Sequence, residues 1–332
     1  MRIENLVEIT GGRLMGSASV SRVGDIHFEA KKVLCGSLFI DLNSSQDSLH
    51  RAIENGAYAV LSENLDKIND NEIAKIEVKS IEKATLKLLR YYIIKKNLKL
   101  IALGDIQYAL LKTLNVEYSI LPKDISRALK VVLKSEDNKK FFINEKLEKL
   151  LGLKSYARPQ REINPSYLES KGLFFSSFLY RDIFLKDYRL SSLFVPHLCA
   201  LIEFLESNKV EYELKNPPTL KNFYPLFLNS NFKIQEFGKS SSAIIIEKDG
   251  ALLKDEYDFI LKKRIDKDLF KLFLPKGLNL NFTPKVQTIT YKNFEEILEL
   301  KKLKFRYILA YCEVENFEEI FKRRDKETKT LF

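Results

Sequence analysis

Two short apolar runs, each with a glycine before its strand, constrain the fold of this chain more than any other feature. In residues 33–40, VLCGSLFI, Gly36 predicts a turn that leads into a buried strand. In residues 52–61, AIENGAYAVL, Gly56 predicts the end of a helix, and a second buried strand follows. The connections of this strand–helix–strand unit are short enough to pack in one layer, which predicts an α/β fold.

Length, composition and charge indicate a two-domain globular protein and argue against nucleic-acid binding. A length of 332 residues predicts two domains, and a hydrophobic fraction of 45% is sufficient for a buried core. The formal net charge of +10 is compatible with nucleic-acid binding. The charges alternate in sign along the expected helices, however, as in EKLEK at 145–149, and this is typical of a solvated face. We therefore expect no nucleic-acid partner.

The cysteines and the N-terminus predict a reduced, cytoplasmic protein. Cys35, Cys199 and Cys312 are far apart and form no Cys-x-x-Cys pair, so we expect buried thiols and no metal site. The first residues lack the basic start and apolar run of a signal peptide. No apolar run approaches the ~20 residues that cross a bilayer, so no membrane span is expected.

A change of pattern near residue 80 predicts a domain boundary. Apolar residues recur at helical spacing after Ser80, so we expect domains at 1–80 and 81–332, with a further division near 215 as an alternative. Asp124, after Pro122, is expected to cap a helix. Further strands are expected at 73–78, 98–103, 118–121, 140–143 and 173–180 and near residues 234, 245, 286 and 308, and further helices at 3–9, 105–114, 124–133, 193–205, 293–303 and 316–323. This alternation predicts a larger, Rossmann-like second domain.

The N-terminal stretch resembles the first domain of the Mur ligases, most of all the branch that adds D-alanyl-D-alanine to the cell-wall precursor. The matching positions belong to the framework of that domain: Val33, Gly36, Leu38, Phe39, Ala52, Gly56, Ala57, Ala59 and Val60. The resemblance implies a small Mur-ligase-type α/β domain at the N-terminus. It covers the first third of the chain.

Positions that contact the uridine nucleotide in that family are altered here. The family's Asp-Ser-Arg is replaced by Glu29-Ala30-Lys31, and its Asp-Gly-His is replaced by Ser44-Ser45-Gln46. The resemblance implies Glu29, Lys31, Ser44 and Gln46 as substrate-binding residues. Lys31 can supply a positive charge in place of the family's arginine, but it cannot donate the two parallel hydrogen bonds of a planar guanidinium.

The family also implies ATP and Mg²⁺, but the sequence does not support them. After the strand at 98–103, residues 104–110 read GDIQYAL, with one glycine and no Lys-Ser/Thr pair. Asp105 would repel a phosphate, and Lys112 follows two helical turns later. A second candidate, Gly238-Lys239-Ser240, precedes an expected strand and not a helix, so a hairpin turn is the better interpretation.

The sequence offers few other candidates for catalytic or ligand-binding residues. His27 and His50 lie near the altered uridine motifs, and each is interpreted as a ligand contact or, more readily, as a structural histidine. His197 and Cys199 are two residues apart on one expected helix, which points their side chains away from each other and argues against a catalytic dyad. The segment 180–189 mixes aromatic, basic and acidic residues after an apolar strand. It suggests a second ligand site at Arg181, Asp182, Asp187 and Arg189, or a core strand followed by a polar loop.

Three functions follow as alternatives. The leading one is a Mur-ligase-like protein of peptidoglycan precursor metabolism that lacks ATP-dependent ligation and binds a UDP-muramyl-peptide or cell-wall synthesis enzymes. The second is an active amide ligase with an unrecognised nucleotide site. The third is a non-catalytic α/β interaction protein. No catalytic residue can be assigned from the sequence.

Overall fold

The computed structural model describes residues 1–65, 68, 70, 72–116, 119–214, 220–263, 265–317 and 319–321. The chain divides into two compact units. The first contains Met1–Gly104 and Tyr118–Arg158, and the second contains Asp105–Glu117 and Pro159–Phe332. The expected boundary near residue 80 stays a prediction, and the alternative division near 215 lies outside the described residues.

The first unit begins with a five-stranded sheet in the order β1-β5-β4-β3-β2, in which β2 to β5 are parallel and β1 is antiparallel. Its elements are α1 (Ile3–Thr10), β1 (Arg13–Met15), β2 (Ile26–His27), the 3₁₀ helix η1 (Ala30–Lys32), β3 (Ser37–Ile40), α2 (Gln46–Glu54), β4 (Ala57–Ser62) and β5 (Ala74–Glu77). The predicted strand–helix–strand unit is β3–α2–β4. Gly36 and Gly56 have positive φ angles of 86° and 92°, as the turns before β3 and β4 require.

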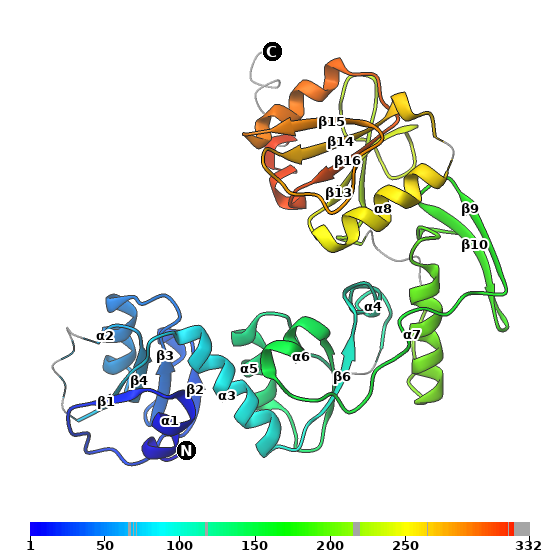
Figure 1. Ribbon diagram of the computed structural model, residues 1–332. Coiled ribbons are helices and arrows are strands. Elements are labelled where there is room, and N and C mark those ends of the chain that lie inside the picture. The colour runs from blue at the N-terminus through cyan, green and yellow to red at the C-terminus, as the bar shows by residue number, and fades with distance from the viewer. Residues whose placement is uncertain are drawn as a thin grey trace. The chain divides into compact units, whose positions relative to one another are not determined.

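A smaller parallel sheet in the order β6-β8-β7 completes the first unit. Its elements are α3 (Ile81–Lys95), β6 (Lys99–Leu103), β7 (Ser119–Ile120), α5 (Ile125–Lys134), β8 (Lys140–Asn144) and α6 (Glu145–Leu151). Figure 1 shows α3 between the first sheet and α5. One continuous core extends from Ile3 to Leu151 and includes the buried face of α3, so both sheets share their hydrophobic interior.

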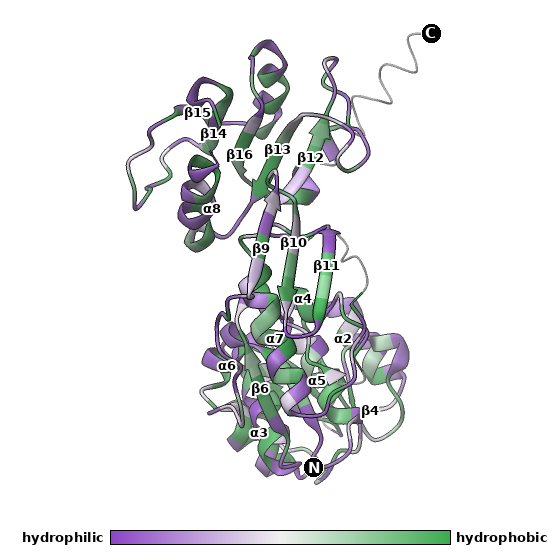
Figure 2. Ribbon diagram, turned by 90° about the vertical axis from the view of Figure 1, so that its right-hand side faces the viewer, coloured by the Kyte–Doolittle hydropathy of each residue, from purple (hydrophilic) through white to green (hydrophobic). Residues whose placement is uncertain are grey.

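The second unit opens with helices and an antiparallel sheet in the order β11-β10-β9. These elements are α4 (Asp105–Leu111), β9 (Tyr167–Lys171), β10 (Phe175–Tyr180), β11 (Ile183–Tyr188) and α7 (Val195–Ser207). Figure 2 shows β10 as mainly hydrophobic and β9 as mainly hydrophilic. This difference follows burial, because β9 is an exposed edge strand and Phe178 in β10 is fully buried.

A second five-stranded sheet, in the order β12-β13-β16-β14-β15, forms the rest of this unit. Its elements are β12 (Tyr224–Leu228), β13 (Ser242–Glu247), α8 (Gly250–Lys262), η2 (Lys267–Leu269), β14 (Phe270–Pro275), β15 (Gln287–Tyr291), η3 (Phe294–Lys302) and β16 (Tyr307–Tyr311). Only β12 is antiparallel to its neighbour, and residues 314–317 and 319–321 are helical. The predicted α/β class is confirmed.

Several predicted elements differ in detail. The helix expected at 293–303 is a 3₁₀ helix over Phe294–Lys302, and Ile234 makes a single bridge to Leu228 and no strand. The predicted helix at 105–114 ends at Leu111. Residues 239–241 belong to the connection between the antiparallel strands β12 and β13, so the hairpin interpretation of Gly238-Lys239-Ser240 is confirmed. The strands β1, β2, β9, β11, β12 and β14 and the helix α8 had not been predicted.

Candidate functional site

A cavity of about 540 Å³ lies beside β2, the edge strand of the first sheet. We call it the β2 cavity. Its lining residues are 24–29 around β2, Lys32 in η1, Tyr92 on α3, and Lys130, Leu133 and Lys134 on α5. All of them belong to the first unit, so the cavity is built within one compact body.

The sequence of α5 places its two lysines on the cavity side. Asp124 caps the helix by accepting a hydrogen bond of 2.8 Å from the backbone N–H of Arg127, which confirms the predicted cap. The residues buried in the core are Ala128, Leu129 and Val132. Lys130 and Lys134 are four residues apart, so they lie one above the other on a common face of the helix.

The charges that line the cavity are unequally paired. Glu29 accepts from Lys32 at 2.7 Å and from Lys130 at 3.2 Å. The hydrogen bonds from Lys32 and Lys130 lower the pKa of Glu29, so its carboxylate is ionised at neutral pH. Lys134 has no ion-pair partner in the described part of the chain. Three ammonium groups therefore face two carboxylates, those of Asp25 and Glu29, and the lining carries a net positive charge.

Aromatic and imidazole groups complete the lining. Lys130 Nζ lies 5.1 Å from the ring centroid of Phe28. Burial raises the pKa of Tyr92, which keeps its hydroxyl neutral. The Nε2 atom of His27 is buried and has no hydrogen-bond partner among the described residues. The arrangement suits an anion joined to a flat or apolar group, because lysines bind phosphate as point charges and aromatic rings supply a stacking face.

Solved structures of Mur ligases resemble this protein along nearly the whole length of both chains. MurF from Acinetobacter baumannii aligns with a TM-score of 0.58 and 11% identity over 97% of this chain and 98% of that chain. MurF ligase from Thermotoga maritima in complex with ADP aligns with a TM-score of 0.54 and 12% identity over 92% and 98%. The chain has the Mur ligase fold. No family model and no curated protein matches the sequence, so the similarity is established from the structure alone.

The Mur ligase fold extends beyond the third of the chain in which the sequence resembled that family. A further A. baumannii structure, a UDP-N-acetylmuramoylalanyl-D-glutamyl-2,6-diaminopimelate–D-alanyl-D-alanyl ligase, aligns over 98% of both chains with a TM-score of 0.51 and 10% identity. The sequence of the second unit showed no resemblance to the Mur ligases, but its structure is included in the shared fold.

Within this Mur ligase fold, the four expected substrate-binding residues do not come together in the β2 cavity. Glu29 lines it, whereas Lys31 is exposed and the cavity is lined by the neighbouring Lys32. Ser44 is exposed, with a φ of 49°, and Gln46 begins α2. Gln46 donates from Nε2 to the carbonyl of Asn64 at 3.5 Å. The roles of these residues in binding remain predictions.

Sequence reasoning missed Lys32, Lys130, Lys134 and Tyr92. The available signal was the spacing of Lys130 and Lys134 on an amphipathic helix, but solvated helices carry the same spacing. Glu29 and Lys130 are 101 residues apart, and no local pattern reports such a contact. His27, which the sequence had suggested as a ligand contact, does line the cavity, and His50 is exposed on α2.

The second predicted site divides between two ends of a hairpin. Arg181 and Asp182 form the turn between β10 and β11, and Arg189 follows the other end of β11. Arg181 forms ion pairs with Glu203 and Glu206, and the Arg189 guanidinium lies 3.6 Å from the Phe237 ring centroid. The sheet is antiparallel, so the rule that ligands bind at the carboxyl ends of parallel strands does not apply here. A ligand role for these residues remains a prediction.

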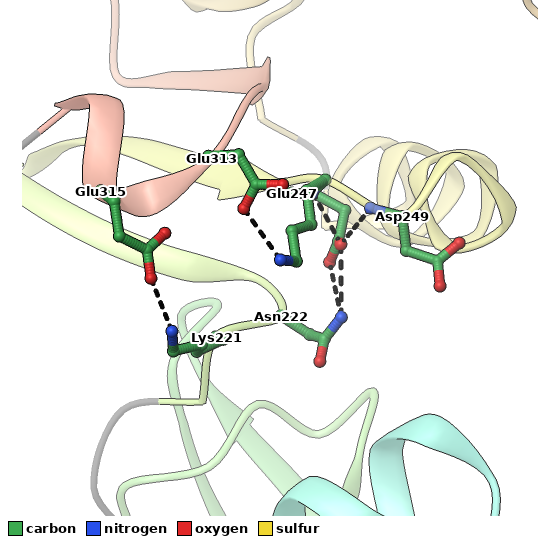
Figure 3. Close-up of polar contacts among 7 residues, drawn as sticks. Lys221, Asn222, Glu247, Asp249, Glu313 and Glu315 are labelled. Atoms are coloured by element: carbon green, nitrogen blue, oxygen red, sulfur yellow. Dashed lines mark hydrogen bonds and ion pairs between the residues drawn. The ribbon is translucent and has the colours of Figure 1, made fainter. Parts of the chain in front are cut away.

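The carboxyl end of β13, in the second five-stranded sheet, is occupied by internal contacts (Figure 3). Glu247 is fully buried and accepts from the backbone N–H groups of Phe223, Lys248 and Asp249 and from the side chain of Asn222. Lys221 pairs with Glu315 at 2.6 Å, and Lys248 pairs with Glu313 at 2.8 Å. Because these lysines are already paired with carboxylates, they leave little positive charge for a phosphate. The hydrogen bonds to Glu247 hold the turn that precedes α8.

The described residues contain no group of three or more His, Cys, Asp or Glu side chains arranged to hold a metal ion. Among the described helices, none combines the length and apolarity that a membrane crossing needs. Burial raises the pKa of Cys199 to about 12, which keeps it a protonated thiol and agrees with the rejection of a Cys199–His197 dyad.

Proposed function

We propose that this protein binds a UDP-linked muramyl peptide in the β2 cavity and acts in peptidoglycan precursor metabolism without ATP-dependent ligation. The observation that supports this proposal most is the combination of Lys32, Lys130 and Lys134 with two aromatic residues in a single cavity of about 540 Å³. A nucleotide diphosphate offers the anion for the lysines and a flat base for the aromatic rings.

The solved structures support the substrate class. The A. baumannii neighbour is, by name, a ligase of a UDP-N-acetylmuramoyl peptide, and its chain aligns with this one along 98% of both. The β2 cavity belongs to the first unit, where the sequence had suggested the altered uridine motif, and Glu29 of that motif lines it. The ligand-contacting residues differ from the family pattern, and the cavity supplies lysines in their place.

The proposed loss of ligation rests on the junction between β6 and α4. Gly104 is followed directly by Asp105, the first residue of a seven-residue helix, and no phosphate-binding loop intervenes. Lys112 lies beyond the end of that helix, where its Nζ is 4.3 Å from the Tyr108 ring centroid. A carboxylate at the helix start opposes phosphate binding, and the lysine and hydroxyl that hold the β- and γ-phosphates and Mg²⁺ are missing at this junction.

An active ligase is the alternative, because the T. maritima neighbour is in complex with ADP. The two functions are separated by calorimetric titration of the purified protein with UDP, UDP-N-acetylmuramoyl-pentapeptide and ATP·Mg²⁺. We expect the UDP ligands to bind and ATP·Mg²⁺ to give no heat above dilution. ATP binding together with precursor-dependent phosphate release would overturn the proposal.

A pair of variants assigns any binding to the β2 cavity. The double substitution Lys130→Ala, Lys134→Ala removes two ammonium groups from the lining, and we expect on the order of tenfold weaker binding of UDP. Lys154→Ala is the matched control, because Lys154 is exposed, belongs to the first unit and lies outside the lining. Equal affinity in the double variant and the wild type would place the ligand elsewhere.

A further inference from the structure

Two serines and one lysine from three separate elements meet within the second unit. Ser170 is in β9, Ser192 lies two residues before the N-cap of α7, and Lys263 is the C-cap of α8. We call these three residues the Ser–Lys cluster. The proposed function makes no use of them, because the β2 cavity belongs to the first unit.

The side chains of the Ser–Lys cluster are within hydrogen-bond distance of one another. Lys263 Nζ lies 2.6 Å from Ser170 Oγ and 3.5 Å from Ser192 Oγ, and the two serine oxygens are 2.6 Å apart. A hydroxyl hydrogen rotates to suit its neighbours, so the O–H of Ser170 can point to Nζ when the amine is neutral. The distance between Nζ and Ser170 Oγ therefore suits proton transfer from a nucleophile to a base.

The lysine of the cluster is not neutralised by a carboxylate. Among the described residues, Lys263 has hydrogen bonds to the two serines and no ion pair, and its Nζ lies 4.8 Å from the ring centroid of Phe259. A carboxylate would hold the proton on the amine, whereas burial lowers the pKa of Lys263. The neutral form of this amine is therefore easier to reach than that of an exposed lysine, as a general base requires.

The backbone holds both serines in place and leaves one of them within reach of a ligand. Ser170 pairs with Ser176 of β10, and Ser176 Oγ donates to the carbonyl of Leu190 at 2.8 Å. This hydrogen bond holds the segment that carries Ser192 against the sheet. Ser192 is buried, whereas Ser170 is half-buried and lies on an exposed edge strand. Ser170 is therefore the hydroxyl that a ligand can approach.

Apolar side chains lie on both sides of this hydroxyl. Successive residues of a strand point to opposite faces, so Leu168 and Ser170 share one face of β9. Leu168 is 39% exposed, and it offers apolar contact to a group that approaches Ser170. Phe259 of α8 adds an aromatic ring beside the lysine. This setting suits an uncharged reactant that carries a short apolar chain.

We propose that Ser170 and Lys263 act as nucleophile and base in the hydrolysis of carboxylic esters with a short apolar acyl chain. Ser170 Oγ attacks the carbonyl carbon while its proton passes to neutral Lys263. The bond from Oγ to the acyl carbon forms, the C–O bond to the alcohol breaks, and Lys263 gives the proton to the departing alcohol. Water, activated by the same amine, then displaces the acyl group and restores both residues.

The test uses two reagents on the full-length protein. A fluorophosphonate ester should leave a single covalent adduct, seen by intact-mass spectrometry and located on Ser170 by peptide mapping. p-Nitrophenyl butyrate should be hydrolysed by the untreated protein, and not by the protein that carries the adduct. Urea-unfolded protein should react with neither reagent. The proposal is contradicted if the folded protein forms no adduct, if the adduct is on another residue, or if hydrolysis is absent or continues after labelling.

Variants separate the two roles. Ser170→Ala should abolish the adduct, and Ser166→Ala, at an exposed serine directly before β9, is its control and should react as wild type. Lys263→Arg keeps the positive charge but removes the base, so labelling of Ser170 should slow on the order of 100-fold. Lys262→Arg, at an exposed neighbour on α8, should change nothing. Equal labelling rates in Lys263→Arg and the wild type would contradict the role of the lysine.

Discussion

Glu29 and Lys130 form an ion pair of 3.2 Å that joins the start of η1 to the middle of α5 across 101 positions of the sequence. Glu29 pairs with Lys32 as well, so one carboxylate holds two of the three lysines of the β2 cavity. Any anion that enters the cavity competes with Glu29 for these lysines. The ion pair is therefore a determinant of affinity as well as of structure.

Replacing this carboxylate should strengthen binding. Glu29→Gln removes the competing charge and keeps the side-chain shape, so we expect UDP to bind about two- to fivefold more tightly by calorimetry. Glu8→Gln, an exposed position on α1, is the matched control and should not change affinity. Weaker binding by Glu29→Gln would mean that Glu29 contacts the ligand directly, as the family pattern had suggested.

Salt should weaken the binding of UDP to the β2 cavity. The Debye length is about 10 Å at 0.1 M salt and shrinks as salt is added, which screens the half-exposed Lys130 and the exposed Lys134. We expect the dissociation constant for UDP to rise steadily between 50 and 500 mM NaCl, and to rise less steeply in Lys134→Ala. Affinity that is independent of salt would show that the diphosphate does not contact these lysines.

The pH dependence of stability should change in Glu256→Gln. The folded-state pKa of Glu256 is raised above the usual value of 4.5, so the folded protein holds a proton that the unfolded chain releases. The contribution of Glu256 to folding is therefore complete below about pH 4.5 and is lost as the pH rises through the folded-state pKa.

Thermal and urea unfolding from pH 4 to pH 8 measure this effect. Above pH 4.5, the free energy of unfolding of Glu256→Gln should increase relative to wild type by up to about 1.4 kcal/mol per pH unit. The difference between the two proteins removes the contribution of other groups such as His197. A constant difference across this range would show that Glu256 is ionised in the folded protein.

Two glycines offer a matched test of the first sheet. A Cβ atom on Gly56, at φ +92°, would lie 3.0 Å from the Cα of Cys35, whereas a Cβ atom on Gly16, at φ +74°, meets nothing within 4 Å. Gly16→Ala should lose about 1–2 kcal/mol for its backbone conformation alone. Gly56→Ala should lose at least about 1 kcal/mol more, because the backbone of Cys35 cannot move freely. An equal loss of stability in the two variants, measured by thermal unfolding, would show that the turn at Gly56 adjusts to the added Cβ atom at little cost.

Local signals account for the elements that the sequence predicted correctly. The turns at Gly36 and Gly56, the buried β3 and the cap at Asp124 each depend on residues within a few positions of one another. The helix α8 had such a signal too, because Leu253, Tyr257 and Ile260 recur at helical spacing, but Gly250 at its start reads as a turn. β14 is a short apolar run, and periodicity alone does not distinguish such a run from part of a buried helix.

The candidate site was harder to predict because it is assembled from distant segments. The β2 cavity joins residues near 28 with residues near 92 and 130. The sequence indicated Glu29 and His27 because they lie in a family motif. The residues that face them come from helices whose charged positions resemble ordinary solvated faces. Only the packing of those helices shows which lysines face the cavity.

The proposed function is tested most directly by calorimetric titration of the wild-type protein and the Lys130→Ala, Lys134→Ala variant with UDP-N-acetylmuramoyl-pentapeptide, with and without ATP·Mg²⁺. We expect saturable binding by the wild type, binding on the order of tenfold weaker in the variant, and no effect of ATP·Mg²⁺. No binding to the wild type, or binding that requires ATP·Mg²⁺, would contradict it.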